Sequence, residues 1–397
     1  MAFPGIHQNT TLCYPDKVSG AQLLPDAEYP GSVSENESYL KEQLITYIGN
    51  KRALLDFIGR GIRKVRERLD KDKLATFDVF SGSGVVARYF KQFSCLVMVN
   101  DLEKYSRVIN ECYLSNLSGI NMPCLQEYYR EITGALADEP LRRGLIADLY
   151  APADEDNIRP EDRVFYTVRN AAYIDTAREL IGNLPEGEQR YFLAPLLSEA
   201  SIHANTSGVF KGFYKNREKG AGQYGGRNQD ALGRITGRIE LPFPVFSAFD
   251  SDVIICQGDS NAVIESVPEV DLAYLDPPYN QHPYGSNYFM LNLILDNKRP
   301  ENISRVSGIP GDWNRSRYNR ENAAYAALTE LTANIKAKFV LVSFNSEGFI
   351  SPPEMQAMLS GLGRVEALEI KYNAFRGSRN LNHRDIHVKE YLYLLEK

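Results

Sequence analysis

Two stretches of the chain, residues 41–120 and 251–397, alternate short apolar runs with segments of helical periodicity. Strands that alternate with helices are typical of a parallel α/β sheet. The expected strands are 76–80, 95–100, 253–259, 271–279 and 338–344, and the expected helices are 51–70, 85–90, 102–117, 288–295 and 355–363. Two final apolar runs, 365–375 and 387–397, flank a polar loop, so we expect them to form antiparallel strands.

About 130 residues between the two stretches, 121–250, lack this alternation and are long enough for a module of their own. We therefore predict an α/β domain built from 41–120 and 251–397, with 121–250 inserted into it. Residues 1–40 are rich in Pro, Gly, Ser and acidic residues and predict an irregular N-terminal arm.

The composition is that of a packed globular protein, with 43% hydrophobic and 24% charged residues. We see no apolar run near the ~20 residues that a membrane span needs. The N-terminus has no signal-peptide pattern, and the five cysteines are scattered without a CxxC pair. These features predict a cytoplasmic protein with reduced thiols and no metal site. Structural roles are expected for Cys112, Cys256 and Trp313.

The formal net charge of −6 is unevenly distributed. Residues 41–75 carry ten Lys and Arg against five acidic residues, and residues 211–238 carry seven against two. Because nucleic-acid binding depends on local basic surfaces, the sequence is compatible with a basic cleft on an acidic protein.

A glycine turn, Asp78-Val79-Phe80-Ser81-Gly82-Ser83-Gly84, follows the expected strand 76–80. Glycines let the backbone approach a ligand closely, and the next helix would offer free N–H groups. Asp101, at the end of the next strand, is placed to accept hydrogen bonds from ribose hydroxyls. A plain structural turn and a helix N-cap are the alternative interpretations of these two features.

The most specific motif is Asp276-Pro277-Pro278-Tyr279, after the apolar run 272–275. Two prolines stiffen the turn and remove two backbone donors, which leaves the Asp276 carboxylate and the neighbouring carbonyls as fixed acceptors. Such acceptors suit an amino group with two hydrogens. Tyr279 offers a flat face on which a base can stack.

Together, Phe80 to Gly84, Asp101, Asp259 and Asp276 to Tyr279 resemble the motifs of the Dam-type N6-adenine DNA methyltransferases. Their order is that of the class called alpha, or D12-like. The segment Tyr47 to Arg52 is similar to that family's N-terminal motif, whose lysine lies near the methionine part of the cofactor.

The resemblance implies a Rossmann-like S-adenosylmethionine-dependent methyltransferase sheet in which 121–250 is a target-recognition domain that binds DNA. The implied catalytic residues are Asp276, Pro277, Pro278 and Tyr279. The implied S-adenosylmethionine-binding residues are Tyr47, Lys51, Asp78, Phe80, Ser81, Gly82, Gly84, Asp101, Asp259 and Asp276.

A reaction at the adenine N6 atom requires the base to leave the duplex. Asp276 and the Pro277 carbonyl would accept from the amino hydrogens, and Tyr279 would stack on the base. Residues 280–288 are similar to a family loop near the flipped base.

The stretch 210–238 mixes basic residues, aromatic residues and glycines. Basic residues neutralise phosphates and adaptable loops follow grooves, although a solvated surface loop is the alternative. The predicted DNA-binding residues are Lys211, Tyr214, Lys215, Asn216, Arg217, Lys219, Arg227 and Arg234, with Asn228 and Gln229 as further candidates for base contacts. Arg376 and Arg379 would contact phosphate or simply solvate a hairpin turn.

Other functions remain open on the sequence alone. At this position, cytosine N4-methyltransferases usually have a motif similar to Ser-Pro-Pro-Tyr, and protein-glutamine methyltransferases one similar to Asn-Pro-Pro-Tyr. Asp276 therefore favours adenine as the substrate. An RNA adenine N6-methyltransferase and a non-catalytic nucleic-acid binder stay as alternatives. The expected partners are double-stranded DNA and, within a restriction–modification system, a cognate restriction endonuclease; we expect a monomer.

Overall fold

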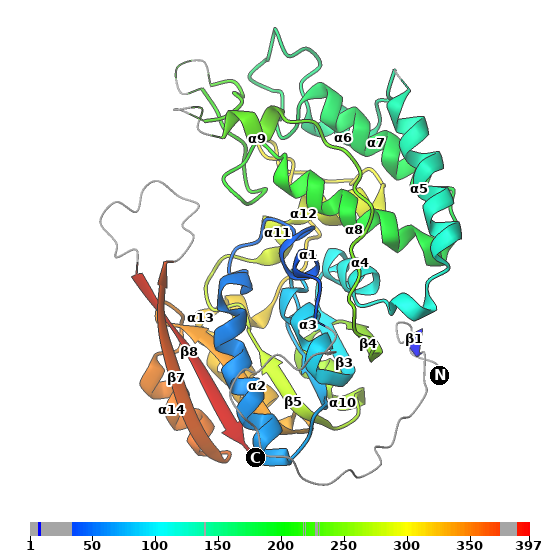
Figure 1. The fold of residues 1–397 in the computed structure, drawn as a ribbon. Coiled ribbons are helices and arrows are strands. Elements are labelled where there is room, and N and C mark those ends of the chain that lie inside the picture. Colours follow the sequence, from blue (N-terminus) through cyan, green and yellow to red (C-terminus); the bar gives the residue numbers. More distant parts are fainter. Residues whose placement is uncertain are drawn as a thin grey trace.

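The computed structural model describes residues 7–8, 34–138, 140–216, 218, 220–226, 229, 231–373 and 387–397. Its centre is a mixed β-sheet in the order β1-β4-β3-β2-β5-β6-β8-β7 (Figure 1). The strands are β1 (His7–Gln8), β2 (Leu74–Asp78), β3 (Ser94–Asp101), β4 (Asp252–Gln257), β5 (Val270–Leu275), β6 (Ala337–Asn345), β7 (Arg364–Asn373) and β8 (His387–Glu396).

Strands β2 to β6 pair in parallel, as the alternation of strands and helices predicts. The two C-terminal strands are antiparallel to each other, which confirms that expectation, and β8 inserts between β6 and β7. The chain runs from β2 outward to β3 and β4, and β5 then lies on the other side of β2. This reversal of strand order opens a crevice at the carboxyl ends of β2 and β5, where open α/β sheets bind ligands.

Helices cover both faces of the sheet (Figure 1). On one face, α2 (Leu55–Leu69) and α3 (Val85–Phe90) share a core with β-strand side chains such as Leu272 and Leu341. On the other, α10 (Ser260–Ser266), α13 (Glu321–Asn334) and α14 (Pro352–Ser360) pack over Ala273 and Val340. Shorter connecting elements are α1 (Glu37–Lys41), α11 (Tyr284–Asn287), η1 (Arg52–Leu54), η2 (Lys91–Phe93), η3 (Leu117–Gly119) and η4 (Arg317–Asn319).

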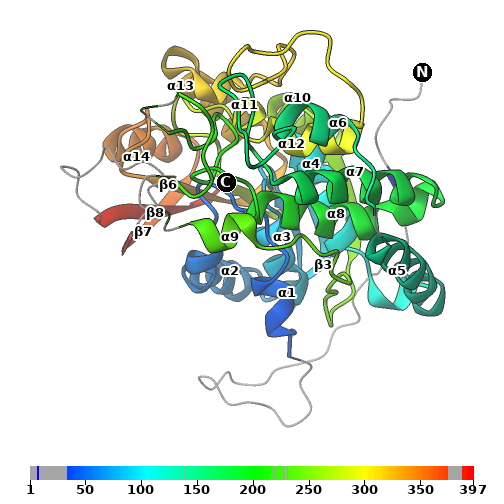
Figure 2. The same cartoon turned by 90° about the horizontal axis from the view of Figure 1, so that it is seen from above.

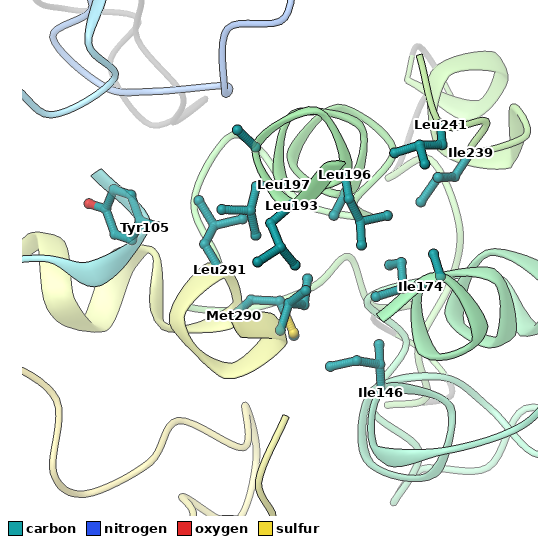
Figure 3. Packing of buried hydrophobic residues seen from close by; sticks show 14 of the residues in the cluster. Tyr105, Ile146, Ile174, Leu193, Leu196, Leu197, Ile239, Leu241, Met290 and Leu291 are labelled. Atoms are coloured by element: carbon teal, nitrogen blue, oxygen red, sulfur yellow. The ribbon is translucent and has the colours of Figure 1, made fainter. Parts of the chain in front are cut away.

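A helical lobe lies beyond the carboxyl ends of the strands (Figures 1 and 2). From residues 121–250 it contains α5 (Met122–Ala137), α6 (Leu145–Tyr150), α7 (Val168–Gly182), α8 (Glu186–Ile202) and α9 (Leu232–Thr236). Of these, α5 to α8 share one apolar core with α4 (Lys104–Tyr113) and α12 (Phe289–Asp296), which lie outside 121–250 in sequence. Figure 3 shows Leu193 and Leu197 of α8 beside Met290 and Leu291 of α12. The lobe therefore draws on three separate stretches of the chain.

Among the residues that the structure describes, no helix is both long enough and apolar enough to cross a bilayer.

Arg88 of α3 is 1% exposed and ties the segment that leads into the site to the sheet domain. Its Nη1 donates to the carbonyls of Tyr39 (2.9 Å) and Glu42 (3.0 Å), and its Nη2 donates to that of Gln43 (3.0 Å). The guanidinium carbon also lies 3.6 Å from the centre of the Tyr113 ring. One buried cation therefore satisfies three carbonyls of residues 39–43.

Replacing this cation, as in Arg88→Leu, is expected to lower the free energy of unfolding by about 3 kcal/mol, because buried carbonyls lose their donors. Urea denaturation followed by circular dichroism measures the change. Arg60→Leu, on the exposed face of α2, is the matched control and should stay within about 0.5 kcal/mol of wild type. Equal losses in both variants would contradict the anchoring role.

Candidate active site

The glycine turn between β2 and α3 is tied to the end of β3. Gly82 and Gly84 have φ angles of +50° and +75°, which side chains other than glycine rarely adopt. At Gly82, a Cβ atom would lie 2.8 Å from Cε1 of Tyr47, so the ring also requires glycine here. The Gly82 N–H donates to Oδ2 of Asp101 over 2.8 Å. The turn and Asp101 thus form one unit, as their order in the sequence suggests.

Asp101 is held by backbone donors on both carboxylate oxygens. Its Oδ1 accepts from the N–H of Glu103 over 2.9 Å, while Oδ2 accepts from Gly82. Burial raises the pKa of Asp101, and these backbone hydrogen bonds act in the opposite direction. The carboxylate is therefore fixed in orientation at the edge of a pocket.

This pocket lies at the carboxyl ends of β2 to β5, in the crevice where the strand order reverses. It brings together six of the residues predicted from the sequence: Tyr47, Phe80, Asp101, Asp259, Asp276 and Pro278. The other predicted residues of the sheet domain do not line it: Lys51, Asp78, Ser81, Gly82, Gly84, Pro277 and Tyr279. Several of these support it from behind, since Ser81 and Gly82 hydrogen-bond to the end of β3.

Tyr284 and Gly285, from the loop 280–288 that the sequence singled out, also line the pocket. Several other lining residues were not predicted from the sequence, among them Glu103, Asn314, Ser316 and Asn319. Burial, together with the charge of Asp101, raises the pKa of Glu103 to about 7. Its Oε2 accepts from Asn292 over 2.7 Å and from Asn314 over 3.2 Å. The segment around Asn314 has no periodic pattern of apolar residues, so nothing in the sequence indicated that it lines the pocket.

A cluster of tyrosines connects the N-terminal motif to α11 and α12. The Tyr47 ring stacks on Tyr284 and Tyr288, with centroid distances of 4.9 and 4.7 Å. Ile48 is held at both backbone atoms: its N–H donates to the Tyr288 hydroxyl (2.7 Å) and its carbonyl accepts from the Tyr284 hydroxyl (3.1 Å). The segment that ends at Lys51 is thereby fixed against the far side of the pocket.

Asp276 follows the last residue of β5 and pairs with Lys51. The Lys51 ammonium is 4% exposed and lies 3.1 Å from Asp276 Oδ1 and 2.8 Å from Glu390 Oε1. Burial raises the pKa of Asp276 to about 6, although Lys51 opposes the rise and Glu390 adds to it. The carboxylate therefore changes its protonation close to neutral pH.

Tyr279 is positioned by the loop after β6. Its carbonyl accepts from the N–H of Phe349 over 3.0 Å, and its ring meets the edge of Phe344 at a centroid distance of 6.1 Å. The motif that begins at Asp276 is thus supported by the sheet on one side and by residues 344–349 on the other.

The basic stretch of the insert lies partly outside the described residues. Of that stretch, Arg217, Lys219, Arg227 and Asn228 lie outside the described residues. Arg376 and Arg379, between β7 and β8, also lie outside them. Lys211 and Lys215 are exposed, whereas the Arg234 guanidinium donates to the carbonyls of Ile202, Ala204 and Thr206. Arg234 therefore has an internal role at the end of α8, which the sequence did not suggest.

The start of this stretch meets the segment that follows the Asp276 motif. The N–H of Phe210 donates to the carbonyl of Asn287 over 2.7 Å. Burial and the nearby charge of Lys211 both lower the pKa of His282. Lys211 therefore stands beside the loop that begins at Asp276.

Comparison with known proteins agrees with this arrangement. The model of a family described as D12 class N6 adenine-specific DNA methyltransferase matches residues 47–358. Type II methyltransferase M.NlaIII of Neisseria lactamica is 28% identical over 363 residues, covering 89% of this chain and 99% of that protein. M.CviAII of Paramecium bursaria Chlorella virus 1 is 28% identical over 362 residues, covering 88% and 98%. Modification methylase StsI of Streptococcus sanguinis is 27% identical over 375 residues, covering 88% and 52%.

Proposed function

The chain belongs to the D12 class N6 adenine-specific DNA methyltransferases, and from this premise we propose how its own residues carry out the reaction. The methyl donor is S-adenosylmethionine, and the acceptor is an adenine turned out of a specific site in duplex DNA. The observation that carries the proposal is Asp276, a partly buried carboxylate that follows β5 and borders the same pocket as Asp101 and Phe80.

The residues around the pocket fit S-adenosylmethionine, which is positively charged at its sulfonium and its ammonium. Three carboxyl groups, those of Asp78, Asp101 and Asp276, gather at the ends of neighbouring strands. Burial raises the pKa of all three, and Asp78 Oδ1 has no hydrogen-bond partner among the described residues. A cation stabilises such a group of acids. Asp101 and Asp259 would bind the nucleoside, and Phe80 would contact the adenine ring.

When bound, S-adenosylmethionine supplies an activated methyl group. Asp276 accepts a hydrogen bond from the adenine N6 amino group, which helps to localise the nitrogen lone pair. The Pro277 carbonyl accepts a hydrogen bond from the other N–H of the same group. Tyr279 stacks on the base and holds it for in-line attack. After transfer the nitrogen must lose one proton. A carboxyl group whose pKa is about 6 takes that proton and returns it to water near neutral pH.

The helical lobe and the basic stretch that continues from it would bind the DNA. Lys211 and Lys215 are exposed, and Lys211 lies beside the loop that follows the Asp276 motif. This places positive charge where the phosphates around a flipped nucleotide would pass. We propose that 121–250 is the target-recognition domain, and that Tyr214 and Asn216 belong to the same DNA-binding surface.

The names of the relatives extend the proposal to biological context. M.NlaIII and M.CviAII are type II methyltransferases, and StsI is a modification methylase. By analogy, this chain would protect its recognition site from a cognate restriction endonuclease. We also propose that it acts as a monomer.

The direct test incubates the protein with tritiated S-adenosylmethionine and either mixed-sequence duplex DNA or, in a parallel reaction, RNA, then identifies the labelled nucleoside by mass spectrometry. We expect N6-methyl-deoxyadenosine, and protection mapping would then give the site. Label in RNA alone, or in no nucleic acid while the methyl donor still binds, would overturn the proposal.

The DNA contacts can be tested separately by replacing the two exposed lysines. Lys211→Ala/Lys215→Ala should weaken duplex binding about tenfold and lower the salt slope of log K by about 2, because two phosphates are no longer neutralised. Fluorescence anisotropy at several salt concentrations measures both quantities. As the control, Lys336→Ala/Lys397→Ala removes two lysines from the opposite end of the sheet, near the start of β6. It should leave the duplex affinity and the salt slope unchanged. An unaltered salt slope in Lys211→Ala/Lys215→Ala would mean that this surface does not bind DNA.

A further inference from the structure

Glu390 is a buried carboxylate in β8, outside the residues that the family model matches. It is 0% exposed, and its Oε1 accepts from Lys51 (2.8 Å) and from the hydroxyl of Ser343 (2.6 Å). Its Oε2 has no hydrogen-bond partner among the described residues. The strand lies inside the sheet, with Asn345 of β6 and Ile370 of β7 opposite Glu390 on either side.

Sheet packing alone does not account for this residue. Side chains alternate between the two faces of a strand, so Glu390 shares a face with Leu392 and Leu394. Both leucines are fully buried in the core that includes α2. Burying a carboxylate among apolar side chains costs several kcal/mol unless a cation compensates it. Here the cation is Lys51, which also contacts the acid at the centre of the site.

We propose that Glu390 is a positioning residue for the methyl transfer, which holds Lys51 between two carboxylates so that Lys51 only partly neutralises Asp276. The inference rests on the proposed function. If the Lys51 ammonium paired with Asp276 alone, the Asp276 carboxylate would be only weakly basic. It would then be a poor acceptor for the hydrogen bond from the amino group and for the released proton. Sharing the ammonium with Glu390 preserves the basicity of Asp276 while Lys51 keeps its position.

The charged and titratable side chains that face Asp276 are Lys51, Asp78, Tyr274, Tyr279, Tyr284 and Glu390. Burial raises the pKa of all three tyrosines, so these phenols stay neutral through the acid range. Asp78 is a second carboxyl whose pKa is raised, so its titration must be separated from that of Asp276.

Glu390→Gln gives the direction of the expected change. The substitution removes the negative charge that raises the pKa of Asp276 and leaves Lys51 to Asp276 alone. The ionised form of Asp276 is then favoured, so its pKa falls below the wild-type value of about 6. The acid limb of the kcat profile should move to lower pH, while kcat at pH 8 should fall about tenfold because the acceptor is a weaker base.

The first readout is the titration of Asp276 in protein labelled with carboxyl-¹³C aspartate, with the Asp276 signal assigned by its loss in Asp276→Asn. Glu390→Gln should shift the midpoint to lower pH. In Glu390→Met the new side chain has a similar length and needs no hydrogen bond. This variant should shift the Asp276 midpoint in the same direction, and it is used in place of Glu390→Gln if that variant does not fold. Glu369→Gln makes the same chemical change at an exposed position of β7 and should leave the midpoint unaltered.

The second readout, the pH profile of kcat, separates the two proposals. If wild-type protein methylates adenine but Glu390→Gln and Glu390→Met leave the Asp276 midpoint and the acid limb in place, Glu390 merely stabilises the sheet and the inference is wrong. If wild-type protein transfers no methyl group to adenine, the proposed reaction fails, whatever the titration gives.

Discussion

Asp276→Ala is expected to reduce the rate of methyl transfer by about a thousandfold, because the hydrogen-bond acceptor for the adenine amino group is lost from the site. The dissociation constant of S-adenosylmethionine should change by less than about tenfold, since Asp101 and the glycine turn remain in place. Single-turnover transfer of the tritiated methyl group and isothermal calorimetry measure the two quantities.

Two variants accompany this measurement. Asp276→Asn keeps the shape of the side chain and should be about as inactive, because an amide is a much weaker acceptor and cannot take up the released proton. Asp72→Ala removes an aspartate that is fully solvent-exposed, before β2, and should behave as wild type. Substantial activity in Asp276→Asn would mean that shape rather than charge supports the reaction.

Asp101→Ala should have the opposite effect to Asp276→Ala: it should weaken binding of the methyl donor more than it slows methyl transfer. The substitution removes a carboxylate that we expect to bind the nucleoside, and it leaves the Gly82 N–H without its acceptor. A charge-assisted hydrogen bond contributes about 1.5–3 kcal/mol, so the dissociation constant should rise by roughly 10- to 100-fold. At saturating donor, the rate should fall far less than in Asp276→Ala.

Calorimetry and single-turnover rates on both variants test the assignment as a pair, with Asp72→Ala again as the control. Tight donor binding in Asp101→Ala, combined with weak binding in Asp276→Ala, would reverse the two roles.

Much of the sheet domain could be predicted from the sequence because its motifs are local. The turn from Asp78 to Gly84 and the motif that begins at Asp276 each follow an apolar run, and parallel strands bring their carboxyl ends to one edge. The expected strand 271–279 ends at Leu275, because a proline at 277 cannot donate to a ladder. Boundaries were therefore less accurate than the order of the elements.

What the sequence did not reveal depends on contacts between distant segments. Glu103 meets Asn314, and Lys51 meets Glu390, across separations of more than 200 residues. For Glu390 a signal was present, since it stands two and four residues before Leu392 and Leu394 in an alternating strand. A carboxylate on the apolar face of an alternating strand predicts that a buried basic side chain pairs with it.

The packing of α12 has a mechanical consequence. Residues 276–283 follow β5 of the sheet domain, and the chain then passes through α11 into α12, whose apolar side chains are buried in the helical lobe. This short connection is therefore anchored at both ends, in two different apolar cores. Pro277 and Pro278 restrict the backbone torsions at its start, so Asp276 has less conformational freedom than the residues from Tyr279 onward.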